Sequence, residues 1–274
     1  LIPDPSYPNN YLDVQLLGGV PVPVPLAAQE GYALDLSAFQ RALTPRTKAV
    51  ILTHPNNPTT TVFPRTQLAE LARFIMANGL FLVVDQAFED SVFDGIEFVS
   101  PAALPDMWER TITVCSISKG MGLSGFRVGY LVACERIMDV LYGAAVNVLG
   151  ATNTLSQILA EAALKDDGFM RSYVEIFQRR RKIAYELFSK IPGVKMLLPQ
   201  SAFFSWLDVS ALGDSAFLTQ QIFEQGRVVV NDGRNYGRQG VGCLRVIHGC
   251  LGQDEELSDA LERVAAVLTL YVGR

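Results

Sequence analysis

The chain has 274 residues, of which 49% are hydrophobic, and its formal net charge is −5 at pH 7. This length and this apolar fraction are sufficient for one large domain or two modest ones. Acidic and basic residues are interspersed, so we expect neither a basic nucleic-acid-binding stripe nor an acidic disordered tail.

The first half of the chain alternates short apolar runs with a helical pattern. Apolar side chains at helical spacing predict a helix over residues 67–77, which Asn78-Gly79 ends. Runs without polar alternation are typical of strands covered on both faces, so we expect a buried, mostly parallel sheet with helical crossovers. The four runs that predict its strands are residues 49–53, 80–84, 111–115 and 129–133.

The second half begins with helices and then becomes mixed. The apolar patterns predict helices over residues 137–145, 155–164 and 169–191, followed by short strands over 202–209, 228–230 and 243–247 and by two more helices. This change predicts a second, smaller α+β domain. The basic run Arg179-Arg180-Arg181-Lys182 is interpreted as a solvated helix face rather than a ligand site.

Cysteine and histidine usage limits the kinds of site. The four cysteines are scattered without a CxxC pair, which favours reduced thiols in a cytoplasmic protein. The two histidines disfavour a histidine-rich zinc site or a Ser-His-Asp triad, and no metal site is expected. No run is long and apolar enough to span a bilayer. The first residues lack signal-peptide features and an initiator methionine, so the chain is expected to begin within a longer protein.

Polar clusters follow three of the predicted strands. Asn56-Asn57-Pro58 follows the first strand, Asp85 follows the second, and Ser116-Ile117-Ser118-Lys119 follows the third. Ligands of α/β sheets bind outside the carboxyl ends of the strands, so these clusters are expected to share one edge of the sheet.

The chemistry of these groups suits one cofactor. A lysine amine such as that of Lys119 forms a Schiff base with an aldehyde when its pKa is lowered. A buried Asp85 needs a positive partner, which a protonated pyridine nitrogen provides. Arg127, in a glycine-rich stretch, offers a phosphate fork. Together these groups predict a pyridoxal 5'-phosphate site. Taken singly, Asn57-Pro58 is typical of a structural turn, Asp85 of a helix cap and Lys119 of a surface lysine, so the prediction depends on their combination and order.

Three segments resemble the class I and II aminotransferase family. They are Pro55–Thr59, Asp85–Phe88 and Ser116–Tyr130, and the third is the most specific. The resemblance implies a fold-type I enzyme, a three-layer α/β/α mostly parallel sheet with a smaller C-terminal α+β domain. The cofactor-binding large domain would occupy residues 1–165. The small domain would occupy residues 166–274 and begin with a long interdomain helix.

The resemblance also implies how the cofactor is held. Asn57 would donate a hydrogen bond to the phenolic oxygen of pyridoxal phosphate, and Asp85 would pair with the pyridinium nitrogen. Ser116, Ser118 and Arg127 would lie around the phosphate.

The reacting groups follow from the same resemblance. Lys119 would form the internal aldimine and then shuttle a proton. Tyr7, in Pro5-Ser6-Tyr7-Pro8, would stack on the ring. Arg245 would grip the substrate α-carboxylate through two hydrogen bonds. The implied enzyme is a homodimeric aminotransferase that acts on an α-amino acid and a 2-oxo acid.

The chain departs from the family pattern in four places. Two of them are Pro58-Thr59-Thr60 in place of the usual Pro-Thr-Gly, and Asn231-Asp232-Gly233 in place of a commoner proline-glycine stretch. Phe88 stands where the family usually has a tyrosine that donates to the phenolic oxygen, and a phenylalanine cannot donate. Relatives also carry on the order of a hundred further residues upstream. Two alternatives therefore stay open: a lyase, decarboxylase or amino-acid oxidase or hydroxylase on the same fold, and a non-catalytic effector domain that binds the cofactor.

Overall fold

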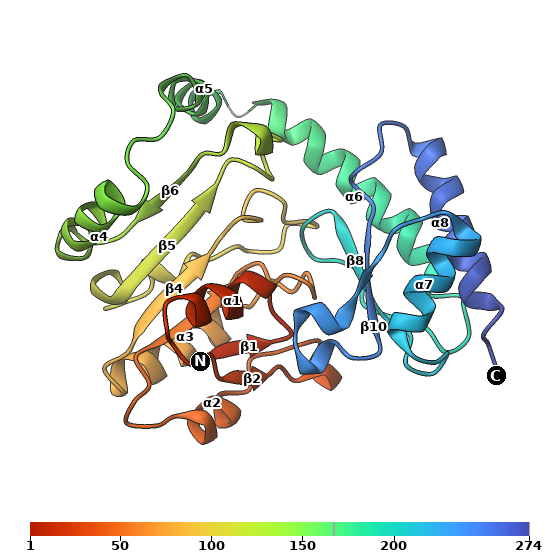
Figure 1. The fold of residues 1–274 in the computed structure, drawn as a ribbon, viewed down its shortest axis with the longest axis horizontal. Coiled ribbons are helices and arrows are strands. Elements are labelled where there is room, and N and C mark those ends of the chain that lie inside the picture. The colour runs from red at the N-terminus through yellow and green to blue at the C-terminus, as the bar shows by residue number, and fades with distance from the viewer. Residues whose placement is uncertain (167, 274) are drawn as a thin grey trace.

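The computed structural model describes residues 1–166 and 168–273 (Figure 1). Its helices are α1 (Pro8–Leu16), α2 (Leu36–Ala42), α3 (Arg65–Ala77), α4 (Glu135–Val148), α5 (Thr154–Lys165), α6 (Gly168–Phe188), α7 (Ser215–Gly226) and α8 (Asp254–Thr269). Its strands are β1 (Ile2–Asp4), β2 (Pro23–Pro25), β3 (Ala49–Thr53), β4 (Phe81–Asp85), β5 (Thr111–Ser116), β6 (Gly129–Val132), β7 (Lys195–Met196), β8 (Phe204–Asp208), β9 (Asn231–Asp232) and β10 (Cys243–Ile247).

The central sheet has the strand order β3-β4-β5-β6, and β3, β4 and β5 are parallel. The parallel pair β1 and β2 lies beside β3, because the N–H of Ile51 donates to the carbonyl of Leu1 at 2.9 Å. The predicted strands of the first half are confirmed in place, and the fold is the expected α/β class with a mostly parallel sheet.

Residues 129–132 form the predicted strand, but the prediction that this strand is buried is wrong. β6 runs antiparallel to β5, and all four of its residues are exposed. A neighbouring strand that runs parallel to the preceding one normally requires a crossover connection of a dozen or more residues, usually a helix. The connection from Ser116 to Gly129 contains only the short 3₁₀ turn Ser124–Phe126, so the chain returns antiparallel. A short apolar run cannot reveal either its direction or its exposure.

Helices lie on both faces of the central sheet. The apolar side of α3, including Leu71 and Ile75, packs against Val50 and Leu82 in the larger core cluster. Ile112 points to the opposite face and packs against α4. This arrangement gives three layers and leaves the carboxyl ends of β3, β4 and β5 free at one edge.

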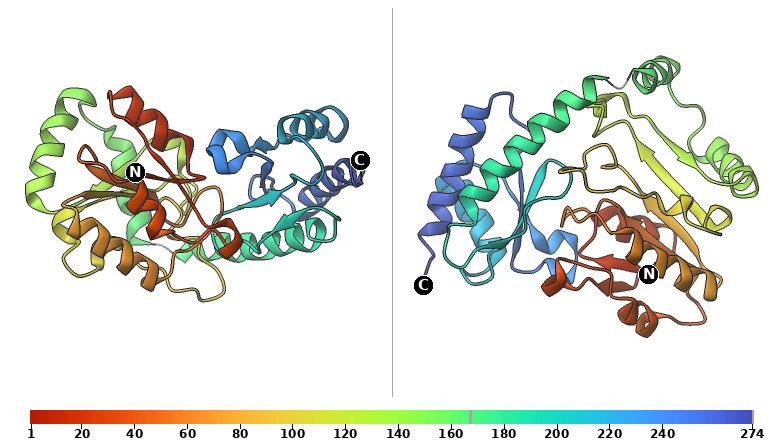
Figure 2. Two further views of the ribbon diagram at one scale, coloured as in Figure 1. Left: turned by 90° about the horizontal axis from the view of Figure 1, so that it is seen from below. Right: turned by 180° about the vertical axis from the view of Figure 1, so that it is seen from behind.

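The C-terminal part is built on a smaller antiparallel sheet of order β7-β8-β10-β9. Helices α7 and α8 and the end of α6 bury a second core cluster against it. The predicted strand at residues 228–230 is wrong. The strand that pairs with β10 begins immediately after this run and consists of Asn231 and Asp232. Helix α6 crosses from α5 to this sheet (Figures 1 and 2).

The basic run on α6 is only partly a solvated face. Arg180 and Arg181 are 3% and 1% exposed. Arg180 donates to Asp254 at 2.7 Å, and Arg181 donates to Asp94 and to the carbonyl of Pro199, each at 2.5 Å. Consecutive residues point about 100° apart on a helix, so four in a row cannot all face solvent. The expectation of a solvated face is therefore wrong for these two arginines.

None of the helices in residues 1–166 and 168–273 is long and apolar enough to cross a membrane. All four cysteines are free, in agreement with the expected reduced thiols.

Both histidines are buried in the neutral form, which predicts a pH-dependent stability. Burial lowers the pKa of His54 to about 4 and, with the charges of Arg180 and Arg181, lowers the pKa of His248 to about 3. Below pH 6.5 the unfolded chain binds protons at these sites and the folded chain does not. The free energy of unfolding is therefore highest above pH 6.5 and decreases as the pH falls toward 4. Each histidine contributes a decrease of about 1.4 kcal/mol per pH unit.

Urea unfolding at pH 7 and pH 5 measures this loss. A His248→Gln variant is expected to show a smaller difference between the two pH values than the unaltered protein. An equal difference in both proteins would contradict the assignment.

Candidate active site

The three polar clusters meet at one edge of the central sheet, as expected from the sequence. Thr53 is in register with Asp85, and Asp85 is in register with Val114. The N–H of His54 donates to the carbonyl of Asp85 at 2.8 Å. The loop after β3, the end of β4 and the end of β5 therefore lie side by side.

Asp85 is a carboxylate in need of a cationic partner. Burial raises its pKa, while the N–H of Ala87, at 3.0 Å from Oδ1, and the charge of Lys119 act in the opposite direction. A cationic ring N–H placed between Asp85 and Lys119 would offset the cost of burying this charge.

The turn that carries Lys119 is closely packed. Ser116 Oγ accepts a hydrogen bond from the N–H of Ser118 at 3.1 Å. A Cβ atom added at Gly120 would overlap the side chain of Asp90, so glycine is the residue that fits after the lysine. Lys119 itself is exposed at this edge.

Arg127 is placed differently from the other expected phosphate ligands. It is exposed, adopts a left-handed φ of 55°, and donates to the carbonyl of Ser124 at 2.6 Å. Within residues 1–166 and 168–273 it makes no hydrogen bond to Ser116 or Ser118, so its place at the phosphate stays a prediction.

Arg245 connects the small sheet to the edge of the central sheet at which the three polar clusters meet. It lies on β10, and its Nη1 donates to Oδ1 of Asn57 at 3.0 Å, across 188 positions of sequence. The arginine fixes Oδ1 of Asn57 as the acceptor and leaves the amide nitrogen to point elsewhere. In the described part of the chain that nitrogen makes no hydrogen bond, so it is free to donate to a bound ring oxygen.

Three residues that the sequence did not single out hold Arg245. Oδ1 of Asn231, on the neighbouring strand β9, accepts from Nε and Nη2 at 3.3 and 2.9 Å. The rings of Phe204 and Tyr236 lie 4.7 and 5.0 Å from the guanidinium carbon. The signal that could have identified Asn231 is its strand pairing with Arg245, and the sequence of a single strand does not reveal its partner.

Tyr7 lies near this arginine on a segment that is tied to the small sheet. Burial lowers the pKa of Arg245, and the nearby phenol groups of Tyr236 and Tyr7 act in the opposite direction. The neighbouring Ser6 donates its N–H to the carbonyl of Tyr236 at 2.8 Å, and buried Asp4 accepts the N–H groups of Arg238 and Gln239 at 3.1 and 3.3 Å. Tyr7 is 37% exposed, so part of its ring is accessible to a ligand.

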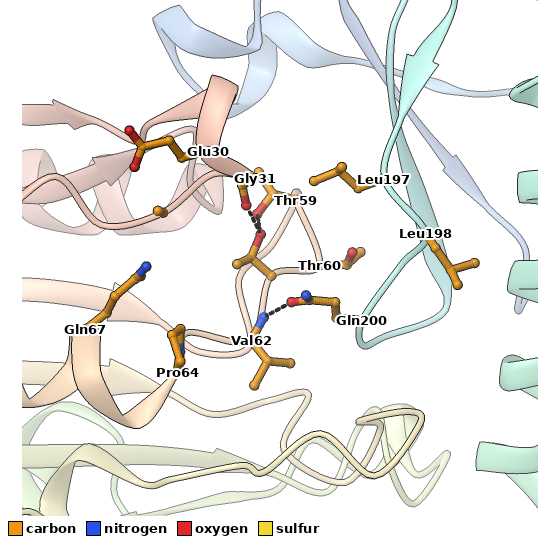
Figure 3. A pocket seen from close by; sticks show the side chains of 12 residues that line it. Glu30, Gly31, Thr59, Thr60, Val62, Pro64, Gln67, Leu197, Leu198 and Gln200 are labelled. Carbon is orange, nitrogen blue, oxygen red and sulfur yellow. Dashed lines mark hydrogen bonds between the residues drawn. The ribbon is translucent and has the colours of Figure 1, made fainter.

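A separate cavity of about 350 Å³ lies beside the loop that carries Asn57 (Figure 3). Its walls include Thr59, Thr61 and Val62 from that loop and Leu197 and Gln200 from the segment before β8. The N–H of Val62 donates to Oε1 of Gln200 at 2.8 Å, and Thr61 Oγ1 donates to the carbonyl of Gly31 at 3.2 Å. These bonds tie the loop to Gly31 and to the segment before β8.

Comparison with known proteins agrees with this geometry. The sequence profile of the family "Aminotransferase class I and II" matches residues 1–264. The chain belongs to the class I and II aminotransferases.

Relatives of this aminotransferase cover nearly all of the chain. The probable aspartate/prephenate aminotransferase of Aquifex aeolicus is 32% identical over 98% of this chain and 69% of its own length. The aromatic-amino-acid aminotransferase 2 of Thermococcus litoralis is 30% identical over 98% and 69%. The solved aromatic aminotransferase from Pyrococcus horikoshii OT3 superposes with a TM-score of 0.93 at 28% identity, over 98% of this chain and 72% of that one.

This aminotransferase is therefore a pyridoxal-phosphate-dependent enzyme that acts on amino acids, as the sequence predicted. The residues present fit the cofactor. A half-buried carboxylate at Asp85, a free amide donor at Asn57 and an exposed amine at Lys119 are the three groups that its ring nitrogen, ring oxygen and aldehyde require.

Proposed function

We propose that this chain binds an α-amino acid through Arg245 and removes the proton of its α-carbon with Lys119. The observation that carries the proposal is the hydrogen bond from Arg245 to Asn57, which places the guanidinium over the edge that holds Asp85 and Lys119. The role of each residue follows from its neighbours.

Pyridoxal phosphate, when bound, supplies an electron sink for the charge that develops at the substrate α-carbon. Asp85 keeps a proton on the ring nitrogen, and Asn57 donates to the ring oxygen. Ser116, Ser118 and Arg127 would hold the phosphate, and Tyr7 would stack on the ring. Lys119 provides the amine that attaches the cofactor and then moves a proton at Nζ.

Arg245 orients the substrate. Its side chain is half-buried, and its contacts with Asn57 and Asn231 fix the plane of the guanidinium. A planar fork binds a carboxylate with two parallel hydrogen bonds, which sets the direction of the α-carbon. Lysine has no such plane and would hold a carboxylate less specifically.

We place the cofactor-binding domain at residues 1–165 and the small domain at residues 166–274, with α6 between them. The two separate core clusters support this division. We further propose a cytoplasmic homodimer. Exposed apolar side chains on α4 and α5, among them Val140, Tyr142, Val146 and Ile158, are of the kind that interfaces bury.

Amino-group transfer tests the reaction directly. The holoenzyme is incubated with single amino acids and 2-oxoglutarate, and glutamate, ammonia and carbon dioxide are measured. The proposal predicts glutamate in equal amount to the amino acid consumed. Release of ammonia or carbon dioxide without glutamate would contradict it and favour a lyase or a decarboxylase.

Replacing Asp85 with asparagine tests the ring-nitrogen role. The variant keeps the size and the hydrogen-bond acceptor but loses the charge that the cationic ring nitrogen needs. We expect kcat to fall on the order of 10²- to 10³-fold while the cofactor stays attached. Steady-state kinetics with a cofactor absorbance spectrum provides the measurement, and an unchanged kcat would exclude the role.

A further inference from the structure

We propose that Phe88 is a positioning residue for substrate binding, and that it acts through Phe204 on the guanidinium of Arg245. This inference rests on the proposed role of Arg245 in holding the substrate carboxylate. It goes beyond that role because it assigns a task to a buried phenylalanine that cannot itself bond to substrate or cofactor.

Arg245 is held by rings as well as by hydrogen bonds. Phe204 and Tyr236 each lie against the guanidinium, at 4.7 and 5.0 Å from its carbon to the ring centres. Asn231 and Asn57 accept bonds from its nitrogens. The rings limit its out-of-plane motion, while the two asparagines limit its rotation within the plane.

Strand pairing brings Phe204 to this position. Arg245 on β10 is opposite Trp206 on β8, so Phe204 is its diagonal neighbour on the same face of the sheet. A diagonal pair is within reach of an aromatic ring and a long side chain. The ring of Phe204 needs support on its other side, because a single diagonal contact does not fix its orientation.

Phe88 provides that support from the central sheet. It follows Asp85 by three residues, is 5% exposed, and meets Phe204 edge-to-face with ring centres 5.3 Å apart and planes at 86°. It also meets Phe203 at 5.6 Å and 68°. Phe88, Ala202 and Phe204 form one small buried cluster, separate from the two large cores.

The consequence is that packing connects the cofactor-binding residues at the edge of the central sheet to the carboxylate-binding arginine of the small sheet. Asp85 ends β4, and Phe88, three residues later in the turn that follows, supports the ring against the carboxylate-binding arginine. A polar group is not required for this task, and the neighbouring aromatic rings favour an apolar side chain at position 88. Loss of the ring should loosen Arg245 and leave Asp85, Asn57 and Lys119 in place.

The test compares Phe88→Leu, Phe88→Tyr and Arg245→Lys in the holoenzyme. Edge-to-face pairs have the strength that corresponds to roughly a three- to tenfold change in an equilibrium constant. We expect Phe88→Leu to raise the KM for both the amino acid and the 2-oxo acid by that factor, with kcat and the cofactor absorbance band nearly unchanged. Phe88→Tyr keeps the ring and should retain the original KM values.

Phe39→Leu is the matched control. Phe39 is fully buried and has an edge-to-face partner in Phe74 at 5.9 Å, but it lies in the core cluster of the central sheet. It should lower the urea midpoint and leave KM unchanged. If Phe88→Leu does the same while Arg245→Lys raises KM, the positioning role is overturned and the role of Arg245 stands. If Arg245→Lys leaves KM unchanged, both are overturned.

Discussion

Replacing Lys119 with alanine is expected to abolish the visible absorbance band of the bound cofactor and to lower transamination by about 10⁴-fold or more. The reason is that Lys119 supplies both the attachment amine and the group that moves the proton of the α-carbon. The neighbouring Asp85 and Asn57 would remain, so pyridoxal phosphate should still bind without a covalent link. Absorbance spectra and steady-state kinetics of the purified variant measure the two effects.

Lys182→Ala serves as the control for loss of a lysine, because Lys182 lies on α6 away from the three clusters at the sheet edge. It should keep the band and the activity. A Lys119→Ala protein that retains both would show that another amine carries the cofactor.

Replacing Arg245 with alanine is the second large effect. The substrate carboxylate would lose both hydrogen bonds of its partner in a half-buried site, which corresponds to roughly a 100-fold fall in kcat/KM. The cofactor band should persist, because Arg245 touches Asn57 and not Asp85 or Lys119. Kinetics with one amino acid at several concentrations measures the loss of substrate binding, and a cofactor titration measures any loss of cofactor binding.

Arg263→Ala is the matched control, since Arg263 is a partly buried arginine of the same C-terminal part, on α8, and donates to the carbonyl of Gly226 at 2.8 Å. It should leave kcat/KM unchanged. If Arg245→Ala instead releases the cofactor while substrate affinity is kept, the arginine belongs to the cofactor site and the assignment is wrong.

The strand ends of this chain were predictable because chemistry and position coincide there. Apolar runs mark β3, β4 and β5, and a parallel sheet must bring their carboxyl ends together. Asn57, Asp85 and Lys119 can therefore be assigned to one edge of the sheet from the sequence alone. The direction of β6 was not predictable, because an isolated run of apolar residues carries no information on its partner.

Long-range side-chain contacts account for what the sequence left out. Arg180 and Arg181 looked like part of a solvated face, and only the packing of Asp94 and Asp254 from distant segments shows that they are buried. The rings around Arg245 come from β8 and from the segment after β9, and the support from Phe88 comes from after β4. Such contacts depend on how the two sheets meet, which local pattern does not reveal.

The most direct test of the central claim is to reduce the holoenzyme with borohydride, digest it and locate the cofactor by peptide mass spectrometry. Reduction fixes the cofactor to the amine that carries it. The account predicts that the added mass lies on Lys119, within the segment Ser116–Tyr130. Added mass on another lysine, such as Lys48 or Lys165, or no added mass on any lysine, would contradict it.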